Sequence, residues 1–196
     1  MSRNRKTVPK GLHRQIRHSG FKETIKVYDE EDLMHLIEKQ NDFFFLVLDG
    51  VQDPHNLGAC LRTCDGVGVN GVIVPRDHAV SVTDTVRNIS CGGAENIPVY
   101  RVKNLSKSLE MIKESGIRIV GTEDETTRSI YDIDLTGSLA IVLGAEGHGM
   151  RKKTRECCDE VVKIPMRGEV PCLNVSVATG VCLYEALRQR ISLQKI

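Results

Sequence analysis

The sequence predicts an α/β fold in which a mostly parallel β-sheet carries helices on both faces. Short apolar runs recur along the chain and alternate with segments of helical periodicity, which is typical of a parallel sheet. The run at 43–48 (FFFLVL) is continuous rather than alternating, as expected of a strand buried on both sides. The length of 196 residues fits one such domain with a short appendage.

The elements are expected in a regular order along the chain. A helix over 29–39 opens on acidic residues, which suit the positive N-terminal end of a helix dipole. Strands are then expected at 43–48, 72–74, 97–102, 117–121, 139–143 and 160–164. Helices are expected at 56–67, 80–90, 107–114 and 174–189. Ligands of open α/β sheets usually bind at the carboxyl ends of the strands, so we expect functional residues directly after the predicted strands.

We expect residues 1–28 to be a basic arm or the remnant of a linker, and residues 29–196 to be the globular domain. Residues 1–26 carry eight Lys and Arg and one Glu, a net charge of +7, which leaves −6 for the rest of a chain whose total is +1. A basic arm on an acidic body suits a polyanion such as RNA. The same arm serves equally well as a solubilising tail, and the sequence leaves both interpretations open.

Composition excludes several classes of protein. The seven cysteines form no CxxC pair and are odd in number, which indicates reduced thiols in a cytoplasmic protein. We expect no signal peptide and no membrane association, because no apolar run approaches the roughly 20 residues of a membrane span. Aromatic residues make up 4 %, with no Trp, which argues against nucleic-acid binding on aromatic stacking platforms.

One glycine-rich motif lies in the wrong structural context for a nucleotide site. Residues 66–71 match G-x-G-x-x-G, the fingerprint of dinucleotide sites. That site requires the motif between a strand and the helix that follows it, so that helix amides meet the pyrophosphate. Here the motif closes a predicted helix and precedes a strand, so we interpret it as an ordinary turn.

Three segments that follow predicted strands carry candidate chemistry. The first, 49–62, runs through Asp-Pro-His-Asn into a helix. Asp53 or Asn56 is a suitable helix cap, and Arg62 lies nearly two turns beyond Asn56, so we expect the helix to present both on related faces. The alternative is a plain cap followed by a surface arginine.

The second segment, 139–150, is a strand that ends in a loop with three glycines around Glu146. Glycines allow a loop to pass close to a ligand, and the absence of a Walker lysine argues against a nucleoside triphosphate. His148 lies beside Glu146 and is a candidate for acid–base work, although such a histidine is more often an exposed loop residue.

The third segment, 164–180, is a strand end, a loop and the start of the last helix. Asn174 is a natural N-cap there, and Ser176 follows it in the first turn. The helix is more broadly apolar than one interior face requires, so part of it is expected to meet a partner subunit.

Taken together, the three segments resemble the SpoU-type RNA 2′-O-ribose methyltransferases of the SPOUT class. The resemblance covers roughly residues 42–190 and is closest to the branch that modifies a guanosine in 23S ribosomal RNA. It rests on three motifs in the right order and spacing, DPHNLGACLRT (53–63), LGAEGHGM (143–150) and IPMRGEVPCLNVSVATGVCLYEALRQR (164–190).

The resemblance implies S-adenosylmethionine as the methyl donor, ribosomal RNA as the substrate, no metal, a homodimer and a C-terminal trefoil knot. It implies that the cofactor is held by Thr122, Gly144, Ile164, Met166 and Leu173. It implies that the catalytic group consists of Asn56, Arg62, Glu146, Asn174 and Ser176.

Elementary chemistry refines these implied roles. A ribose hydroxyl is a very weak acid, so the developing alkoxide needs a base or a positive charge. Arg62 is a poor base because the pKa of arginine exceeds about 12, so we expect it to act as an electrostatic stabiliser and phosphate clamp. Glu146 would orient Arg62, while Asn174 and Ser176 would position the ribose.

Two departures from the family pattern matter. Cys172 stands where a small hydroxyl residue is common; we expect it to pack, with a thiol that is sensitive to oxidation. Relatives of this branch carry an RNA-binding domain of about 80 residues before the catalytic domain, of a size typical for domains. We favour the interpretation that the chain is a piece of a longer protein; alternatively, the arm supplies RNA affinity alone. A transfer-RNA ribose methyltransferase and a non-catalytic RNA-binding or assembly factor remain alternative functions.

Overall fold

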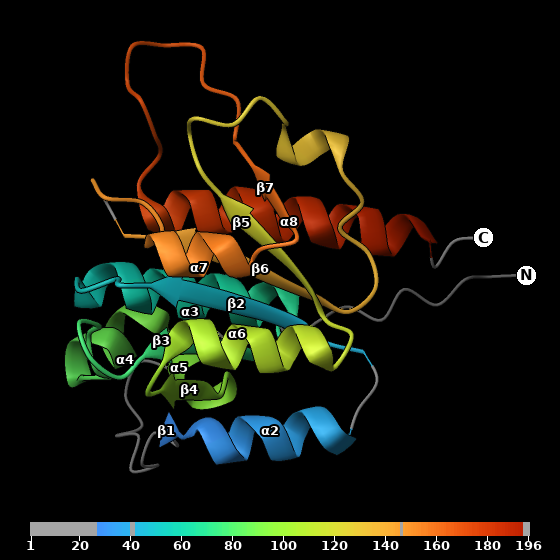
Figure 1. Ribbon diagram of the computed structural model, residues 1–196. Helices are drawn as coiled ribbons and strands as arrows, with labels where there is room; N and C mark the ends of the chain where they lie inside the picture. Colours follow the sequence, from blue (N-terminus) through green and yellow to red (C-terminus); the bar gives the residue numbers. More distant parts are fainter. Residues whose placement is uncertain (1–26, 40–41, 146, 194–196) are drawn as a thin grey trace, which may run out of the picture.

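The computed structural model describes residues 27–39, 42–145 and 147–193, and the described part contains a seven-stranded sheet (Figure 1). All strand pairs in it are parallel, which confirms the α/β prediction. The strand order is β1-β4-β3-β2-β6-β5-β7. The strands are β1 (Val27–Tyr28), β2 (Phe44–Asp49), β3 (Gly71–Pro75), β4 (Val99–Val102), β5 (Arg118–Thr122), β6 (Leu139–Gly144) and β7 (Glu160–Val162).

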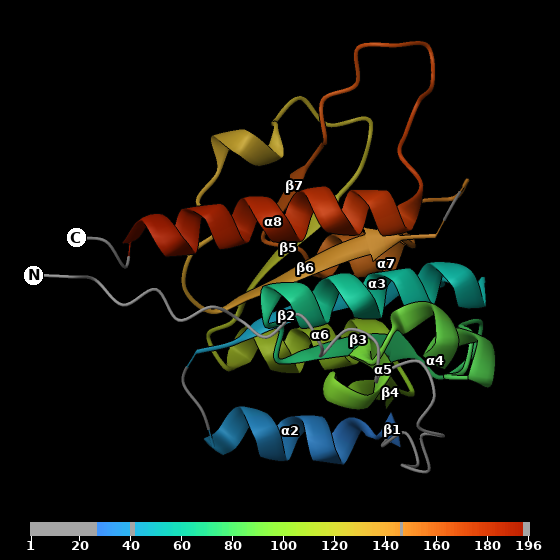
Figure 2. The same ribbon diagram turned by 180° about the vertical axis from the view of Figure 1, so that it is seen from behind.

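Helices cover both faces of the sheet, as Figures 1 and 2 show from opposite sides. α2, α6 and α7 lie on one face, while α3, α4, α5 and α8 lie on the other. Their bounds are α2 (Glu30–Lys39), α3 (Pro54–Val67), α4 (Asp84–Ser90), α5 (Gly93–Asn96), α6 (Leu105–Glu114), α7 (Lys152–Cys157) and α8 (Val175–Leu193), with a 3₁₀ turn η1 (Ile130–Asp132). Among the described helices, none combines the length and apolarity that crossing a bilayer requires.

The central strand β2 explains why its sequence is a continuous apolar run. Every residue of β2 is buried. Leu46 and Leu48 pack into the core under α3 and α8, whereas Phe45 and Val47 pack into the core under α2 and α6. Side chains of a strand alternate between the two faces, so a strand covered on both faces needs apolar residues at every position.

Several boundaries differ from those predicted. The helix expected at 80–90 begins at Asp84, because the backbone N–H of Val80 donates to Val51 O at 3.0 Å and holds that segment extended. α3 begins at Pro54, and its cap is Asp53, which accepts from the N–H of His55 at 2.9 Å. β1 precedes residue 29, where the domain was expected to begin, and pairs with β4.

Besides β1, three short elements were missed, and one motif behaves as expected. α5, η1 and α7 span three to six residues each, too few for a periodic pattern to show. Gly68 of the G-x-G-x-x-G motif has φ +80° and caps the C-terminus of α3 by donating to Cys64 O at 2.9 Å. The motif is therefore a helix-to-strand turn, as predicted.

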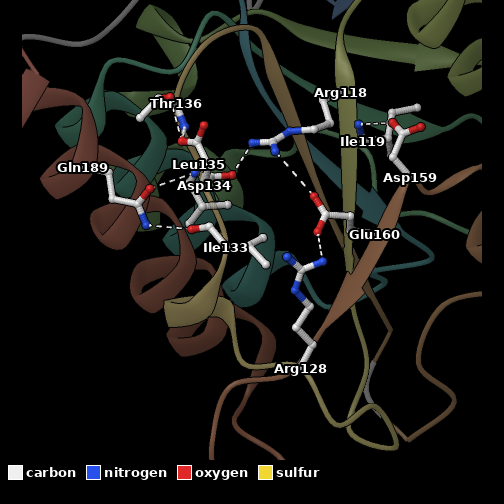
Figure 3. Close-up of polar contacts among 10 residues, drawn as sticks. All are labelled: Arg118, Ile119, Arg128, Ile133, Asp134, Leu135, Thr136, Asp159, Glu160 and Gln189. Atoms are coloured by element: carbon white, nitrogen blue, oxygen red, sulfur yellow. Dashed lines mark hydrogen bonds and ion pairs between the residues drawn. The ribbon is translucent and has the colours of Figure 1, made fainter.

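The segment that connects β5 to β6, residues 123–138, is held at the amino end of the strands by a polar network (Figure 3). Gln189 of α8 accepts from the N–H of Leu135 at 2.8 Å and donates to Ile133 O at 3.1 Å. Glu160 pairs with both Arg118 and Arg128. The network thus holds the β5–β6 connection against β7 and α8.

Candidate functional site

A cavity of about 500 Å³ opens at the carboxyl ends of β5 and β6. This is the edge at which open α/β sheets bind ligands, and the volume suits a small organic molecule. All five residues that the resemblance assigns to the cofactor line this cavity. They are Thr122, Gly144, Ile164, Met166 and Leu173.

The wall from β6 is a tight loop of bare backbone. A Cβ on Gly144 would lie 2.0 Å from Gly149 C and 2.2 Å from Met150 N, so no side chain fits there. Gly149 donates its N–H to Ala145 O at 2.9 Å, and Gly147 and Gly149 have φ of +81° and +63°. Only glycine adopts such angles without cost, which explains the glycines of the motif. Glu146 lies outside the described residues.

The opposite wall comes from the segment between β7 and α8. Lys163, just beyond β7, donates its N–H to Arg128 O at 2.9 Å, and its carbonyl accepts from the N–H of Ile130 at 2.9 Å. These bonds hold the start of the segment that carries Ile164, Met166 and Leu173. Thr122 lies at the end of β5, where its hydroxyl donates to Val142 O at 3.3 Å.

The cavity has an acidic side that the sequence analysis missed. Glu123, Asp124 and Glu125 follow β5 directly and line the cavity. Glu123 forms an ion pair with Arg155 at 2.7 Å, and this contact raises the pKa of the Arg155 guanidinium. The signal was available in the sequence, since three acids follow a strand. They suit a ligand that carries positive charge.

Asn174 connects the first and third segments next to this cavity. Its amide donates to Asn56 Oδ1 at 3.1 Å, across 118 residues of sequence. Its own oxygen accepts from the backbone N–H of Ser176 at 2.9 Å and from the Ser176 hydroxyl at 2.6 Å. Val175, which follows Asn174, lines the cavity. Three of the expected catalytic residues therefore lie together beside the cofactor wall.

Arg62 does not join them within this chain. Asn56 is 8 % exposed, whereas Arg62 is exposed on the same helix. Six residues turn an α-helix by about 600°, which leaves the two side chains about 120° apart. The helix therefore buries Asn56 and exposes Arg62, and does not present them on related faces as expected. The Arg62 side chain makes no hydrogen bond or ion pair within the described residues.

The structure also bears on expectations about two single residues. Cys172 is exposed and lines the cavity, so the expectation that it packs was wrong. His148 is exposed and also lines the cavity. All seven cysteines are free thiols, and burial raises the pKa of Cys60 to about 11. Among the described residues, no group of three or more His, Cys, Asp or Glu is arranged to hold a metal ion.

The fold and the site define a class: an α/β protein with a glycine-walled ligand cavity at the carboxyl edge of a parallel sheet. The SpoU rRNA Methylase family matches residues 44–184, most of the chain. The chain belongs to this family.

Curated relatives agree. The chain is 51 % identical over 193 residues to the 23S rRNA (guanosine-2′-O-)-methyltransferase RlmB of Vibrio vulnificus (strain CMCP6), covering 97 % of this chain and 78 % of the relative. It is 51 % identical over 176 residues to the Escherichia coli (strain K12) protein of the same name, covering 88 % of this chain and 72 % of the relative.

Solved structures agree as well. The SpoU methyltransferase AviRb of Streptomyces viridochromogenes, in complex with AdoMet, superposes with a TM-score of 0.74 at 31 % identity. That match covers 81 % of this chain and 65 % of the solved one, so the chain spans slightly less than two thirds of that structure. The A. aeolicus TrmH/SpoU tRNA modifying enzyme superposes with a TM-score of 0.71 at 32 % identity, covering 84 % of this chain and 85 % of the other.

Proposed function

We propose that this protein transfers a methyl group from S-adenosylmethionine to a ribose 2′-hydroxyl of RNA, at a guanosine of 23S ribosomal RNA. The observation that carries the proposal is the cavity, which brings all five expected cofactor residues together. The names of the relatives, 51 % identical, support 23S ribosomal RNA as the substrate.

The described cavity fits the proposed cofactor. Its volume of about 500 Å³ lies within the range of small-molecule sites. Gly144 lines the cavity with bare backbone, while Ile164, Met166 and Leu173 supply apolar surface. Asp124 and Glu125 suit the positive charges of S-adenosylmethionine, whose sulfonium supplies an activated methyl group.

The residues around the acceptor have distinct proposed tasks. Asn174 holds Asn56 and the first turn of α8 in one hydrogen-bonded group, which positions the ribose. The Ser176 hydroxyl donates to Asn174, which leaves its oxygen as an acceptor for the ribose. Arg62 stabilises the developing alkoxide or the neighbouring phosphate, because a permanent cation suits that charge better than it suits proton abstraction. Glu146 orients Arg62.

We also propose a homodimer whose interface includes α8. Val177, Tyr184 and Ile191 are exposed by 52 %, 54 % and 43 %. They recur every seven residues, two helical turns, and therefore form one apolar stripe on α8. Contiguous exposed apolar surface of this kind marks interaction sites. Light scattering of wild type and of Tyr184→Lys measures the mass; an unchanged mass in the variant, or a monomeric wild type, contradicts this interface.

We further propose that the chain after β7 forms the trefoil knot that the resemblance implies. Support comes from the bridge between Ser129 and Lys163 and from the contacts of Gln189 with the β5–β6 connection. The last segment thus runs beside that connection before α8 begins. Chain tracing in an experimental density map tests this path.

Because the proposed substrate is ribosomal RNA, we propose that the protein acts in the cytoplasm.

The test of function is a methylation assay. The chain is incubated with methyl-labelled S-adenosylmethionine and unmodified 23S ribosomal RNA, followed by nuclease digestion and analysis of nucleosides. We expect label in 2′-O-methylguanosine. Label on a base contradicts the reaction, and label on transfer RNA in a parallel incubation contradicts the substrate.

Calorimetry with the cofactor separates enzyme from binding module. An enzyme of this class binds S-adenosylmethionine, whereas a non-catalytic assembly factor does not need it. Absence of binding at millimolar cofactor contradicts the proposed activity. If the cofactor binds but 23S ribosomal RNA stays unmethylated, the same assay on a form extended at its N-terminus tests whether this chain lacks a part needed to bind RNA.

A further inference from the structure

Asp49 is the last residue of the central strand β2 and is the one fully buried carboxylate among the described residues at this edge. It is 1 % exposed, at the carboxyl end of the sheet, and it lies opposite Gly144 in the register of β2 and β6. A buried carboxylate is costly unless it is paired and hydrogen-bonded. Its partners therefore show what it holds in place.

Both the backbone and the side chain of Arg151 meet this carboxylate. The N–H of Arg151 donates to Asp49 Oδ2 at 2.9 Å, and Nε donates to Asp49 Oδ1 at 2.7 Å. A second guanidinium nitrogen lies 2.5 Å from Oδ1. A carboxylate bound by a guanidinium and a backbone amide at once fixes the position and the direction of the chain at that residue.

Arg151 is the first residue after the glycine loop, and Met150 before it is held as well. Met150 is 7 % exposed and packs in the core with α6 and α7. A Cβ on Gly121 of β5 would lie 2.7 Å from its terminal methyl carbon, so Gly121 makes room for Met150. The exit of the loop is thus fixed to β5 by packing and to β2 by the ion pair.

The entry of the loop is fixed at the same place. Gly144 belongs to β6, and its Cα lies against the backbone of Gly149 and Met150. Gly147, His148 and Gly149 lie between entry and exit and form part of the cavity wall. Any shift of Arg151 therefore moves that wall relative to Thr122 and Ile164 on the other sides.

From this geometry we infer that Asp49 and Arg151 are positioning residues, which hold the glycine wall of the cavity in the geometry that binds the cofactor. The inference rests on the proposed function for the identity of the ligand. Neither residue lines the cavity. The ion pair acts through the backbone of residues 147–150, and the described contacts connect it to the wall at both ends of the loop.

The test compares Arg151→Gln with a matched control, Lys152→Gln. Lys152 is the next residue; its side chain is 89 % exposed, and its one polar contact within the described residues is with Glu156, at 4.0 Å. Both changes take one positive charge from the same surface, but only the first breaks the ion pair. We expect Arg151→Gln to raise the Kd for S-adenosylmethionine about tenfold or more and to lower kcat/KM by about a hundredfold, since displacement of about 1 Å costs this much.

A second readout does not depend on the cofactor. Hydrogen exchange of the Gly149 and Met150 amides reports on the loop itself, and we expect it to accelerate in Arg151→Gln while the amides of β2 and β6 stay protected. Arg151→Lys keeps the charge and loses the two-nitrogen geometry, so we expect intermediate affinity. If Arg151→Gln fails to fold, Arg151→Lys and Asp49→Asn provide the same comparison.

The outcomes separate the inference from the proposed function. Equal effects of Arg151→Gln and Lys152→Gln, or unchanged exchange at Gly149 in Arg151→Gln, overturn the positioning role. A wild-type chain that binds cofactor but methylates no RNA contradicts the proposed reaction and leaves the exchange and affinity tests of the ion pair intact. A wild-type chain that binds no cofactor overturns the assignment of the ligand, and the exchange comparison still decides the role of the pair in the loop.

Discussion

The two ends of strands β5, β6 and β7 differ in how they are made. The carboxyl end is a hollow whose wall from β6 is backbone, with glycines at Gly144, Gly147 and Gly149. The amino end is filled by side chains that bond to backbone, with Arg118, Glu160 and Gln189 in one network (Figure 3). Binding and stability are thus placed at opposite ends of the same strands, and substitutions at each end should affect different measurements.

Loss of Arg62 should give the largest effect on activity. Arg62→Ala takes the proposed cation away from the reacting oxygen, and we expect turnover to fall by about a thousandfold, the upper range for one electrostatic stabiliser. The side chain is exposed, so the melting temperature and the Kd for cofactor should stay nearly unchanged. Single-turnover kinetics and calorimetry measure the two, with Lys39→Ala on α2 as the control. Loss of both turnover and cofactor binding would mean that Arg62 is structural.

Gly144→Ala tests the hollow end directly. The added methyl group would lie 2.0 Å from the carbonyl carbon of Gly149, which is backbone and has little room to move. We expect the Kd for the cofactor to rise and kcat/KM to fall by about a hundredfold, because displacement of about 1 Å in a site has this cost in rate. Gly168→Ala is the matched control, since its Cβ meets nothing within 4 Å. Wild-type affinity of Gly144→Ala in calorimetry would contradict the dependence of the cofactor wall on the close packing of Gly144 against the loop backbone.

Gln189→Ala tests the filled end. The change leaves the N–H of Leu135 and the carbonyl of Ile133 without their partner, and each buried unsatisfied group costs about 1–3 kcal/mol. We expect the melting temperature to fall by several degrees, since about 1 kcal/mol corresponds to about 2–4 °C for a protein of this size. The Kd for cofactor should not change. Equal loss of stability in Ser192→Ala, one turn further on the exposed side, would remove the special role of Gln189.

Acid should first reduce the stability contributed by the network at the amino end of β5, β6 and β7. Hydrogen bonds from Arg188 lower the pKa of Glu185 from its ordinary value of 4.5, and bonds from Thr136 lower the pKa of Asp134 from 3.8. A depressed pKa means that the folded state binds the proton less readily than the unfolded state. The stability it contributes is therefore complete above the ordinary pKa and is lost as pH falls through the folded pKa.

Urea unfolding from pH 7 down to pH 3 measures this dependence. We expect the free energy of unfolding to fall below about pH 4.5, near the ordinary pKa of the glutamate. In Glu185→Gln, the free energy of unfolding should depend less steeply on pH than in the wild type. A variant with the full wild-type slope would show that Glu185 does not contribute.

The smallest expected effect concerns thiol reactivity. Burial raises the pKa of Cys60 to about 11 and that of Cys182 to about 12, so both stay protonated and shielded at pH 8. Cys91 and Cys172 are exposed and should be alkylated first, as mass spectrometry of labelled peptides would show. Cofactor should slow labelling of Cys172, which lines the cavity, and leave Cys91 unchanged. Equal rates at Cys172 with and without cofactor would contradict its place in the wall.

Pattern alone predicted much of the fold, and the reason is physical. The apolar runs that became β2, β5 and β6 are buried on both faces, and such burial requires a continuous run. The short elements α5 and α7 were missed, because a helix of four to six residues is stabilised by tertiary contacts and not by its own periodicity.

For the candidate site too, some features were predicted from the sequence and others required the structure. The five residues of the cofactor wall were predicted by motif, and the structure gathers them in one cavity. The contact of Asn174 with Asn56 and the pairing of Asp49 with Arg151 join residues 118 and 102 positions apart, and no local pattern reports such distances. The three acids at 123–125 are evident in the sequence. That they line the cavity became clear only from the structure.

The sequence by itself determined the parallel α/β sheet, the glycines at Gly144, Gly147 and Gly149, and the resemblance to one family of RNA methyltransferases. These depend on burial and on backbone freedom, which are properties of single residues and their near neighbours. Only the tertiary structure decided that Asn56 is buried and that Arg62 and Cys172 are exposed. It alone also showed that a buried aspartate at the end of β2 holds the exit of the glycine loop. These outcomes depend on which distant segments pack together, and they follow from the whole fold.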